Sequence, residues 1–73
     1  MTTHTLIQMK VNGTVEALAV ETLSQLLDAK GVDTGRKGIA VAVNGAVVPR
    51  VRWPAHGLAS GDSVEIIQAR QGG

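Results

Sequence analysis

Cysteine is absent from this 73-residue chain, and Trp53 is its only aromatic residue. Without cysteine the chain has no disulfide, no thiolate metal ligand and no thiol nucleophile, which fits a reducing compartment. Any sulfur chemistry would have to use sulfur from another molecule. A single aromatic ring also leaves little surface for stacking on bases, so a nucleic-acid-binding face is not expected.

Long apolar segments and a strong charge imbalance are missing as well. Seven Lys and Arg residues against six Asp and Glu residues give a net charge of +1, and the basic residues are scattered along the sequence. Residues 1–5 carry no basic segment before an apolar one, and no stretch approaches the ~20 apolar residues of a membrane span. We expect a soluble, cytoplasmic protein that is monomeric when free and binds neither membrane nor nucleic acid.

No set of residues typical of an enzyme or a metal site is present. His4 and His56 are the only imidazoles, and neither a metal-ligand spacing nor a Ser–His–Asp order accompanies them. A chain of this length is near the lower limit for a self-sufficient core, so we expect no enclosed pocket within it. We expect one domain, residues 1–73, that is not itself an enzyme.

The N-terminal half predicts a hairpin followed by a helix. Residues 7–11 alternate between apolar and polar side chains, which is typical of a strand with one buried face. Asn12-Gly13 is a two-residue turn signal, so a strand from about Thr14 to Ala19 should pair antiparallel with the first. Its weaker alternation is typical of a sheet edge.

The predicted helix begins at a capping box. Thr22 can accept a bond at the helix start, and Gln25, three residues on, can return a bond to Thr22. Gly31 supplies the left-handed residue that ends the helix. Three leucines at i, i+3, i+4 spacing form one apolar stripe facing the sheet: Leu23, Leu26 and Leu27.

The glycine-rich segment 31–38 is a poor match to a phosphate-binding loop. Its first two glycines are separated by three residues where the Walker A motif has four, and Gly38 follows Lys37 where Ser or Thr is needed. The segment also leaves a helix and enters a strand, the reverse of the order in a phosphate loop. We expect an ordinary connection.

The C-terminal half predicts a second hairpin. Residues 39–43 alternate, and Asn44-Gly45 repeats the turn signal before a short strand, Ala46 to Val48. Pro49 should end that strand, after which we expect an irregular, partly extended segment from Arg50 to Pro54. Trp53 should cover one end of the core.

The rest of the chain leads to a glycine tail. Ala55 to Ser60 could hold a single helical turn before Gly61-Asp62 turns the chain into a last strand, from Val64. That strand runs almost directly into Gly72-Gly73, so it would present residues 70–73 as a flexible tail. Glycines lack Cβ and can pass through a narrow channel, which makes the Gly73 carboxylate the candidate reactive group. The alternative is a frayed end without function.

The order hairpin, helix, hairpin, short turn, strand predicts an α+β fold of the β-grasp, or ubiquitin-like, type. The last strand can lie centrally beside the first and parallel to it, because the intervening chain is long enough for a parallel crossover. We therefore expect a mixed sheet of about five strands with one main helix packed on one face.

Several short motifs occur together in this chain: Val43-Asn44-Gly45, Val48-Pro49-Arg50 with Trp53, Gly61-Asp62, and the final Gly72-Gly73. In these motifs the chain resembles the ThiS family, the ubiquitin-like sulfur carriers of thiamine biosynthesis. The helix start around Thr22-Leu23 is also similar. The chain departs from the family in its leading residues 1–5, its lack of Phe, and the polar Arg70-Gln71. These departures bear on the fit to partners.

The resemblance implies a function for the tail. The Gly73 carboxylate would be adenylated by an ATP-using adenylyltransferase resembling ubiquitin-activating enzymes and converted to a thiocarboxylate with sulfur from a persulfide donor. That group would pass sulfur to a thiazole synthase. Gly72, Gln71 and Arg70 would lie in the partner's active site, and this chain would bind no cofactor, since ATP and metal would belong to the partner.

Some alternatives remain at this stage. The small subunit of molybdopterin synthase shares the predicted fold and the Gly-Gly ending, and a ubiquitin-like modifier or a plain interaction module would also fit. Period two turns a set of apolar residues to the outer face of the sheet, where they are a predicted docking patch for the activating enzyme, or else a half-buried edge or dimer contact. The set is Leu6, Ala40, Ala42, Ile67 and Ala69.

Overall fold

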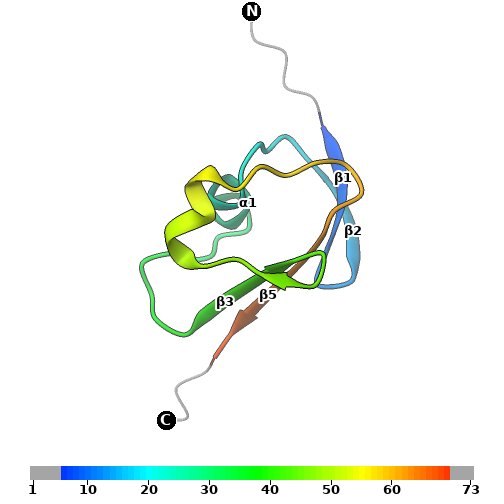
Figure 1. Cartoon of the computed structure of the whole chain (residues 1–73). Coiled ribbons are helices and arrows are strands. Elements are labelled where there is room, and N and C mark those ends of the chain that lie inside the picture. Colours follow the sequence, from blue (N-terminus) through cyan, green and yellow to red (C-terminus); the bar gives the residue numbers. More distant parts are fainter. Residues whose placement is uncertain (1–5, 70–73) are drawn as a thin grey trace, which may run out of the picture.

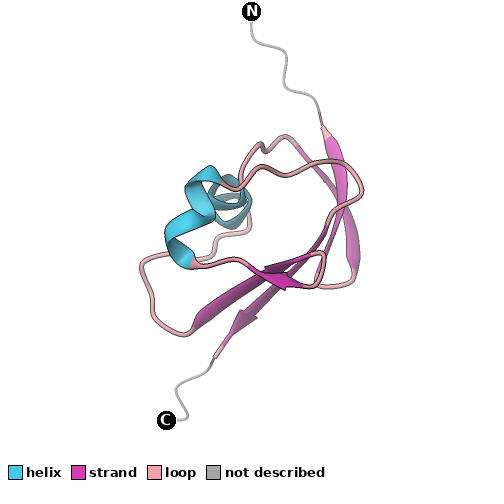
Figure 2. Ribbon diagram, viewed as in Figure 1, coloured by secondary structure: helices cyan, strands magenta, loops and turns pink. Residues whose placement is uncertain are grey.

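The computed structural model describes residues 6–69. In this part of the chain, strands build one sheet, and the helical segments cover one of its faces (Figures 1 and 2). The elements in chain order are β1 (Ile7–Val11), β2 (Thr14–Leu18), α1 (Leu23–Ala29), β3 (Ile39–Val43), β4 (Ala46–Val47), the 3-10 helix η1 (Arg50–Ala55) and β5 (Ser63–Gln68).

The last strand lies in the middle of the sheet. The strand order is β2-β1-β5-β3-β4, with β5 parallel to β1 and antiparallel to β3. Each hairpin therefore supplies one side of the sheet, and the prediction of a β-grasp fold is confirmed. The prediction that β2 is an edge strand is also confirmed.

Both hairpin turns have the backbone angles that the Asn-Gly pairs predicted. The φ angles are 50° at Asn12 and 83° at Gly13, and 53° at Asn44 and 84° at Gly45. Positive φ at both central residues is the mark of a type I′ turn, whose twist matches that of the strands it joins. Asn tolerates this left-handed region better than other residues with a Cβ.

The same two asparagines hold the central strand from its two sides. Asn12 Oδ1 accepts a hydrogen bond from the amide of Ile66 at 2.7 Å, and the Asn12 amide donates to the carbonyl of Val64 at 2.9 Å. On the other side, Asn44 Oδ1 accepts from the Ser63 amide at 2.9 Å, and the Asn44 amide donates to the Ser63 carbonyl at 2.7 Å. Direct pairing of β1 with β5 covers only two residue pairs, so Asn12 lengthens it.

The core lies between the inner face of the sheet and the helical layer. Alternate residues of β1, β3 and β5 face it, as their period-two patterns predicted. The three helix leucines are fully buried. Trp53 is 2% exposed, and its indole Nε1 donates to the carbonyl of Val48 at 2.9 Å. The buried residues are Met9, Val11, Val20, Leu23, Leu26, Leu27, Val41, Val43, Val48, Trp53 and Val64.

The capping box at the helix start differs by one residue from its prediction. Thr22 Oγ1 accepts from the Gln25 amide at 3.2 Å, as expected, but Gln25 Oε1 accepts from the amide of Glu21 at 2.7 Å. Thr22 is extended (φ −128°, ψ 164°) and pairs with Gly57 in an isolated bridge. The amide within reach of Gln25 therefore belongs to the preceding residue.

The helix ends as predicted at a left-handed glycine. Gly31 has a φ of 75°, and its amide donates to the Asp28 carbonyl at 3.0 Å. The Val32 amide donates to the Leu27 carbonyl at 2.9 Å. These two bonds form a Schellman motif, which satisfies carbonyls that the helix leaves without partners.

Two predictions for the segment after β4 are wrong. Arg50 to Pro54 is not extended but belongs to η1, and the helical residues end at Ala55 instead of lying within Ala55 to Ser60. Pro49 (φ −59°) precedes the helix, and its carbonyl accepts from the Arg52 amide at 2.9 Å. Winding the chain here brings the large Trp53 ring into the core, a gain in burial that local sequence preference does not show.

The Asn12 contact predicts a difference between two substitutions at one site. Asn12→Ala should lower the free energy of unfolding by about 2 kcal/mol, because alanine disfavours positive φ and leaves the Ile66 amide without its acceptor. Asn12→Asp keeps an acceptor oxygen and a turn-forming residue, so its loss should stay below about 0.5 kcal/mol. Urea unfolding of the two variants measures this, and equal losses would contradict the role given to the Asn12 side chain.

Candidate functional site

The proposed tail begins directly after the central strand. β5 ends at Gln68, and Ala69 is the last residue that the structure describes. This end of β5 lies at the bottom of Figure 1, far from the start of β1. Arg70, Gln71, Gly72 and Gly73 lie outside the described residues, so their assigned roles stay predictions.

The base of the tail is fixed by the loop that precedes β3. The Ala69 amide donates to the carbonyl of Gly38 at 2.7 Å, which adds a bond beyond the β3–β5 pairing. Gly38 has a φ of 82°, and a Cβ placed on it would lie 3.4 Å from the Cβ and the carbonyl oxygen of Ala69. A glycine therefore suits the positive φ, while the added Cβ would only reach van der Waals contact with Ala69. One backbone hydrogen bond thus holds Ala69 just beyond the end of β5.

A pocket of about 510 Å³ opens beside this base. It lies where the loop meets the ends of β3 and β5, and two of its residues carry positive charge. The residues lining it are Arg36, Lys37, Gly38, Ile39, Gln68 and Ala69. Segment 31–38 is not a phosphate loop by its motif and context, and its spacing did not predict that its two basic residues lie next to Ala69.

Arg50 contacts both this loop and the core residue Trp53. Its guanidinium donates to the carbonyl oxygens of Thr34 and Arg36, and it lies over the Trp53 ring, 4.7 Å from the ring centroid. A planar group with several donors can serve two carbonyls and a ring face at once. In the sequence, the Val48-Pro49-Arg50 and Trp53 motif was the only feature that singled out Arg50. Its spacing did not show that the Arg50 side chain reaches the loop.

Part of the predicted docking patch does come together on the outer face of the sheet. Ala40 pairs with Ile67, and Ala42 pairs with Glu65, in the β3–β5 register. Ile67 is 59% exposed. Period two places Ala69 on the same face as Ile67. We call Ala40, Ala42, Ile67 and Ala69 the outer patch.

Leu6 does not belong to the outer patch. β1 and β5 run parallel, and Lys10 of β1 lies opposite Ser63 of β5. Leu6 lies four residues before Lys10, whereas Ile67 lies four residues after Ser63. The two side chains are therefore roughly 26 Å apart along the strand direction. Face parity was predicted correctly, but grouping Leu6 with Ile67 was wrong because the parallel register places them at opposite ends of the sheet.

Residues 6–69 contain no group of three or more His, Asp or Glu side chains placed to hold a metal ion. In the same part of the chain, no helix has the length and apolar character needed to cross a membrane. What this part offers instead is a rigid strand end flanked by an apolar patch and a basic loop.

Comparison with known proteins gives consistent matches in sequence. The model of the ThiS family matches residues 7–73. The sulfur carrier protein ThiS of Escherichia coli (strain K12) is 32% identical over 59 residues, which cover 81% of this chain and 86% of that protein.

Two solved structures are similar in fold. A crystal structure of the thiamine biosynthesis protein ThiS from Geobacter metallireducens has a TM-score of 0.75 and 28% identity, covering 92% of this chain and 100% of that one. A solution structure of a thiamine biosynthesis protein from the same organism has a TM-score of 0.75 and 27% identity, covering 92% and 88%. The architecture built from the residues is thus shared by these proteins.

Proposed function

The chain belongs to the ThiS family, and from this premise we propose that it carries sulfur as a thiocarboxylate on Gly73 for thiazole formation in thiamine biosynthesis. The observation that carries the proposal is the family match over residues 7–73, which includes Gly72-Gly73. The relatives named for thiamine biosynthesis favour this pathway over that of molybdopterin synthase.

The proposed chemistry begins with activation of a poor electrophile. A carboxylate resists attack because of its negative charge and poor leaving group, so an adenylyltransferase first joins the Gly73 carboxylate to AMP, with release of pyrophosphate from ATP. The terminal sulfur of a persulfide then attacks the acyl carbon, and the bond from that carbon to AMP breaks. A thiol reduces the resulting acyl persulfide at its S–S bond, which frees the thiocarboxylate and leaves a disulfide.

In this scheme the chain is a protein substrate, and the catalytic groups belong to its partners. A chain without cysteine cannot supply the sulfur itself. The thiocarboxylate is a soft nucleophile that a thiazole synthase can use as its sulfur source. ATP and any metal ion would be bound by the adenylyltransferase.

The described residues support this proposal through the base of the tail. Asn12, Asn44 and Gly38 accept hydrogen bonds from amides of β5 and Ala69 and hold these residues in one place. A fixed base gives the tail a defined reach, and in an enzyme site a misplacement near 1 Å can cost ~10²-fold in rate. Gly72, Gln71 and Arg70 would span the channel between this base and the reacting Gly73, and the bare Gly72 would pass its narrowest part.

Deletion of Gly73 tests the proposed reactive residue. The shortened chain would end at Gly72, with its carboxylate withdrawn by about 3.5 Å, so ATP–pyrophosphate exchange by the adenylyltransferase should fall at least ~10²-fold. Gly73→Ala keeps the chain length and a terminal carboxylate, and it should lose much less activity. Circular dichroism should show both variants folded like the wild type. Wild-type exchange by the deletion variant would rule out Gly73 as the carrier of the acyl group.

The outer patch allows a matched pair of substitutions. Ile67→Asp should raise the carrier concentration needed for half-maximal pyrophosphate exchange by about tenfold, because it places a charge in an apolar contact beside the tail. Leu6→Asp makes the same chemical change on the same face at the far end of the sheet, where Leu6 is 63% exposed, and should have little effect. Equal effects of the two substitutions would remove the outer patch from the interface.

A further inference from the structure

Positive charge gathers around the base of the tail. Arg36 and Lys37 line the pocket next to Ala69, and the Arg50 guanidinium donates to carbonyls of the same loop. We call Arg36, Lys37 and Arg50 the basic collar. In the sequence, Arg70 adds one more positive charge directly after Ala69.

The collar is not neutralised by ion pairs among residues 6–69. Within that range the one salt bridge joins Lys30 to Glu16 at 2.6 Å, so neither Arg36 nor Lys37 has a carboxylate within salt-bridge distance there. Asp33 is the only acidic residue of the loop, and its Oδ1 accepts from the Gly35 amide at 3.0 Å.

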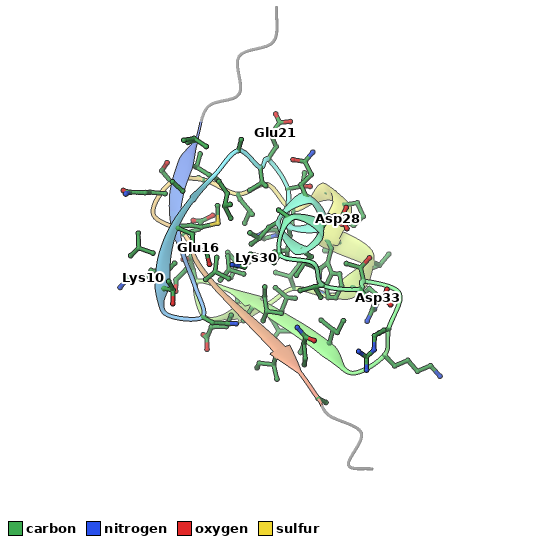
Figure 3. The ribbon with its side chains drawn as sticks, turned by 180° about the vertical axis from the view of Figure 1, so that it is seen from behind. Lys10, Glu16, Glu21, Asp28, Lys30 and Asp33 are labelled. Atoms are coloured by element: carbon green, nitrogen blue, oxygen red, sulfur yellow. The ribbon has the colours of Figure 1, made fainter. Side chains whose placement is uncertain are left out.

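Three of the other acidic side chains, those of Glu16, Glu21 and Glu65, lie away from the collar. Figure 3 shows Glu21 at the end of the molecule opposite the base of the tail, and Glu16 next to Lys30 beside β2. Glu65 is paired in register with Ala42 on the outer face of the sheet. Although the net charge is only +1, Arg36 and Lys37 lie beside Ala69 without an ion pair among residues 6–69.

We propose that the basic collar contacts acidic side chains around the mouth of the tail-binding channel of the adenylyltransferase and steers the tail into it. This inference rests on the proposed function, since it assumes that the tail enters such a channel. Gly73 lies four residues beyond Ala69, or about 14 Å in an extended chain, which exceeds the Debye length of about 8 Å at physiological ionic strength. The collar therefore acts on the rim of the channel and not on the reacting carboxylate or on ATP.

A protein rim fits the collar better than a nucleic acid does. Trp53 is 2% exposed, so the sequence's one aromatic ring is not available for stacking on bases. The collar contains three cations with Asp33 close by in the loop, whereas nucleic-acid surfaces collect many phosphate contacts. Charge complementarity of this modest size mainly raises the association rate between proteins, by a factor that falls as salt is added.

Two single charge reversals separate a local effect from one of net charge. Lys37→Glu reverses a collar residue, and Lys10→Glu reverses an exposed residue of β1 on the far part of the sheet, with the same change in net charge. Association of each purified carrier with the adenylyltransferase of the same organism is followed by stopped-flow fluorescence between about 0.02 and about 0.5 M salt. Pyrophosphate exchange is measured separately at saturating carrier.

The collar proposal predicts a slower association for one variant only. At low salt, Lys37→Glu should reduce the association rate constant about tenfold and Lys10→Glu by less than about twofold, and the difference should vanish at high salt. Exchange at saturation should be the same for all three proteins, because the reacting end of the tail is unchanged.

Each other outcome decides against the collar or against the function. Equal slowing of association by the two variants would mean that only net charge matters. Faster association of Lys37→Glu would mean that the rim of the channel is basic. Either result would overturn the collar proposal. Unchanged association, with retention on a random-sequence polynucleotide lost only in Lys37→Glu, would reassign the collar to nucleic acid and overturn it too. Salt-dependent binding that is weakened by Lys37→Glu but gives no pyrophosphate exchange in the wild type would support the collar and contradict the proposed function.

Discussion

The pairing of β5 on both of its edges is the constraint on which the rest of the structure depends. β1 meets it over a short parallel register that Asn12 lengthens, β3 meets it over its full length, and Gly38 adds a bond at Ala69. A strand in the centre of a sheet opens only when its neighbours separate, and the last residues, Ile67 to Ala69, keep hydrogen-bonded neighbours on the β3 side. The proposed tail starts at that point.

This arrangement fits the proposed role, in which the chain presents its tail to an enzyme that performs the chemistry. The core consists of aliphatic and Met side chains and one tryptophan, and it covers the inner face of the sheet. Of the two faces of the sheet, only the outer one is left for contacts with other proteins. The outer patch and the basic collar then flank the strand end from different sides, one apolar and one charged. The first would contribute contact area in a complex, and the second would contribute speed of approach.

The sequence was sufficient wherever the signal was local. Two Asn-Gly pairs, a capped leucine stripe and period-two strands predicted the hairpins and the helix, because each depends on neighbouring residues. The order of the sheet was predicted from the order of these elements and the length of the crossover. The sequence was insufficient where contacts between distant residues determine the structure. The 3-10 helix forms because Trp53 is drawn into the core, Leu6 lies apart from Ile67 because of a parallel register, and Arg50 reaches a loop that begins far earlier in the chain. Gly73 could be selected from the sequence because its proposed role depends on chemistry more than on packing.

The central claim is that Gly73 becomes a thiocarboxylate, and intact-mass spectrometry tests it most directly. The carrier is incubated with the adenylyltransferase, ATP, a persulfide donor and a thiol, and a parallel sample omits ATP. The account predicts a mass increase equal to the exchange of one oxygen for one sulfur, dependent on ATP and confined to the C-terminal peptide that contains Gly73. An unchanged mass while ATP is consumed, or sulfur found on any other residue, would contradict it.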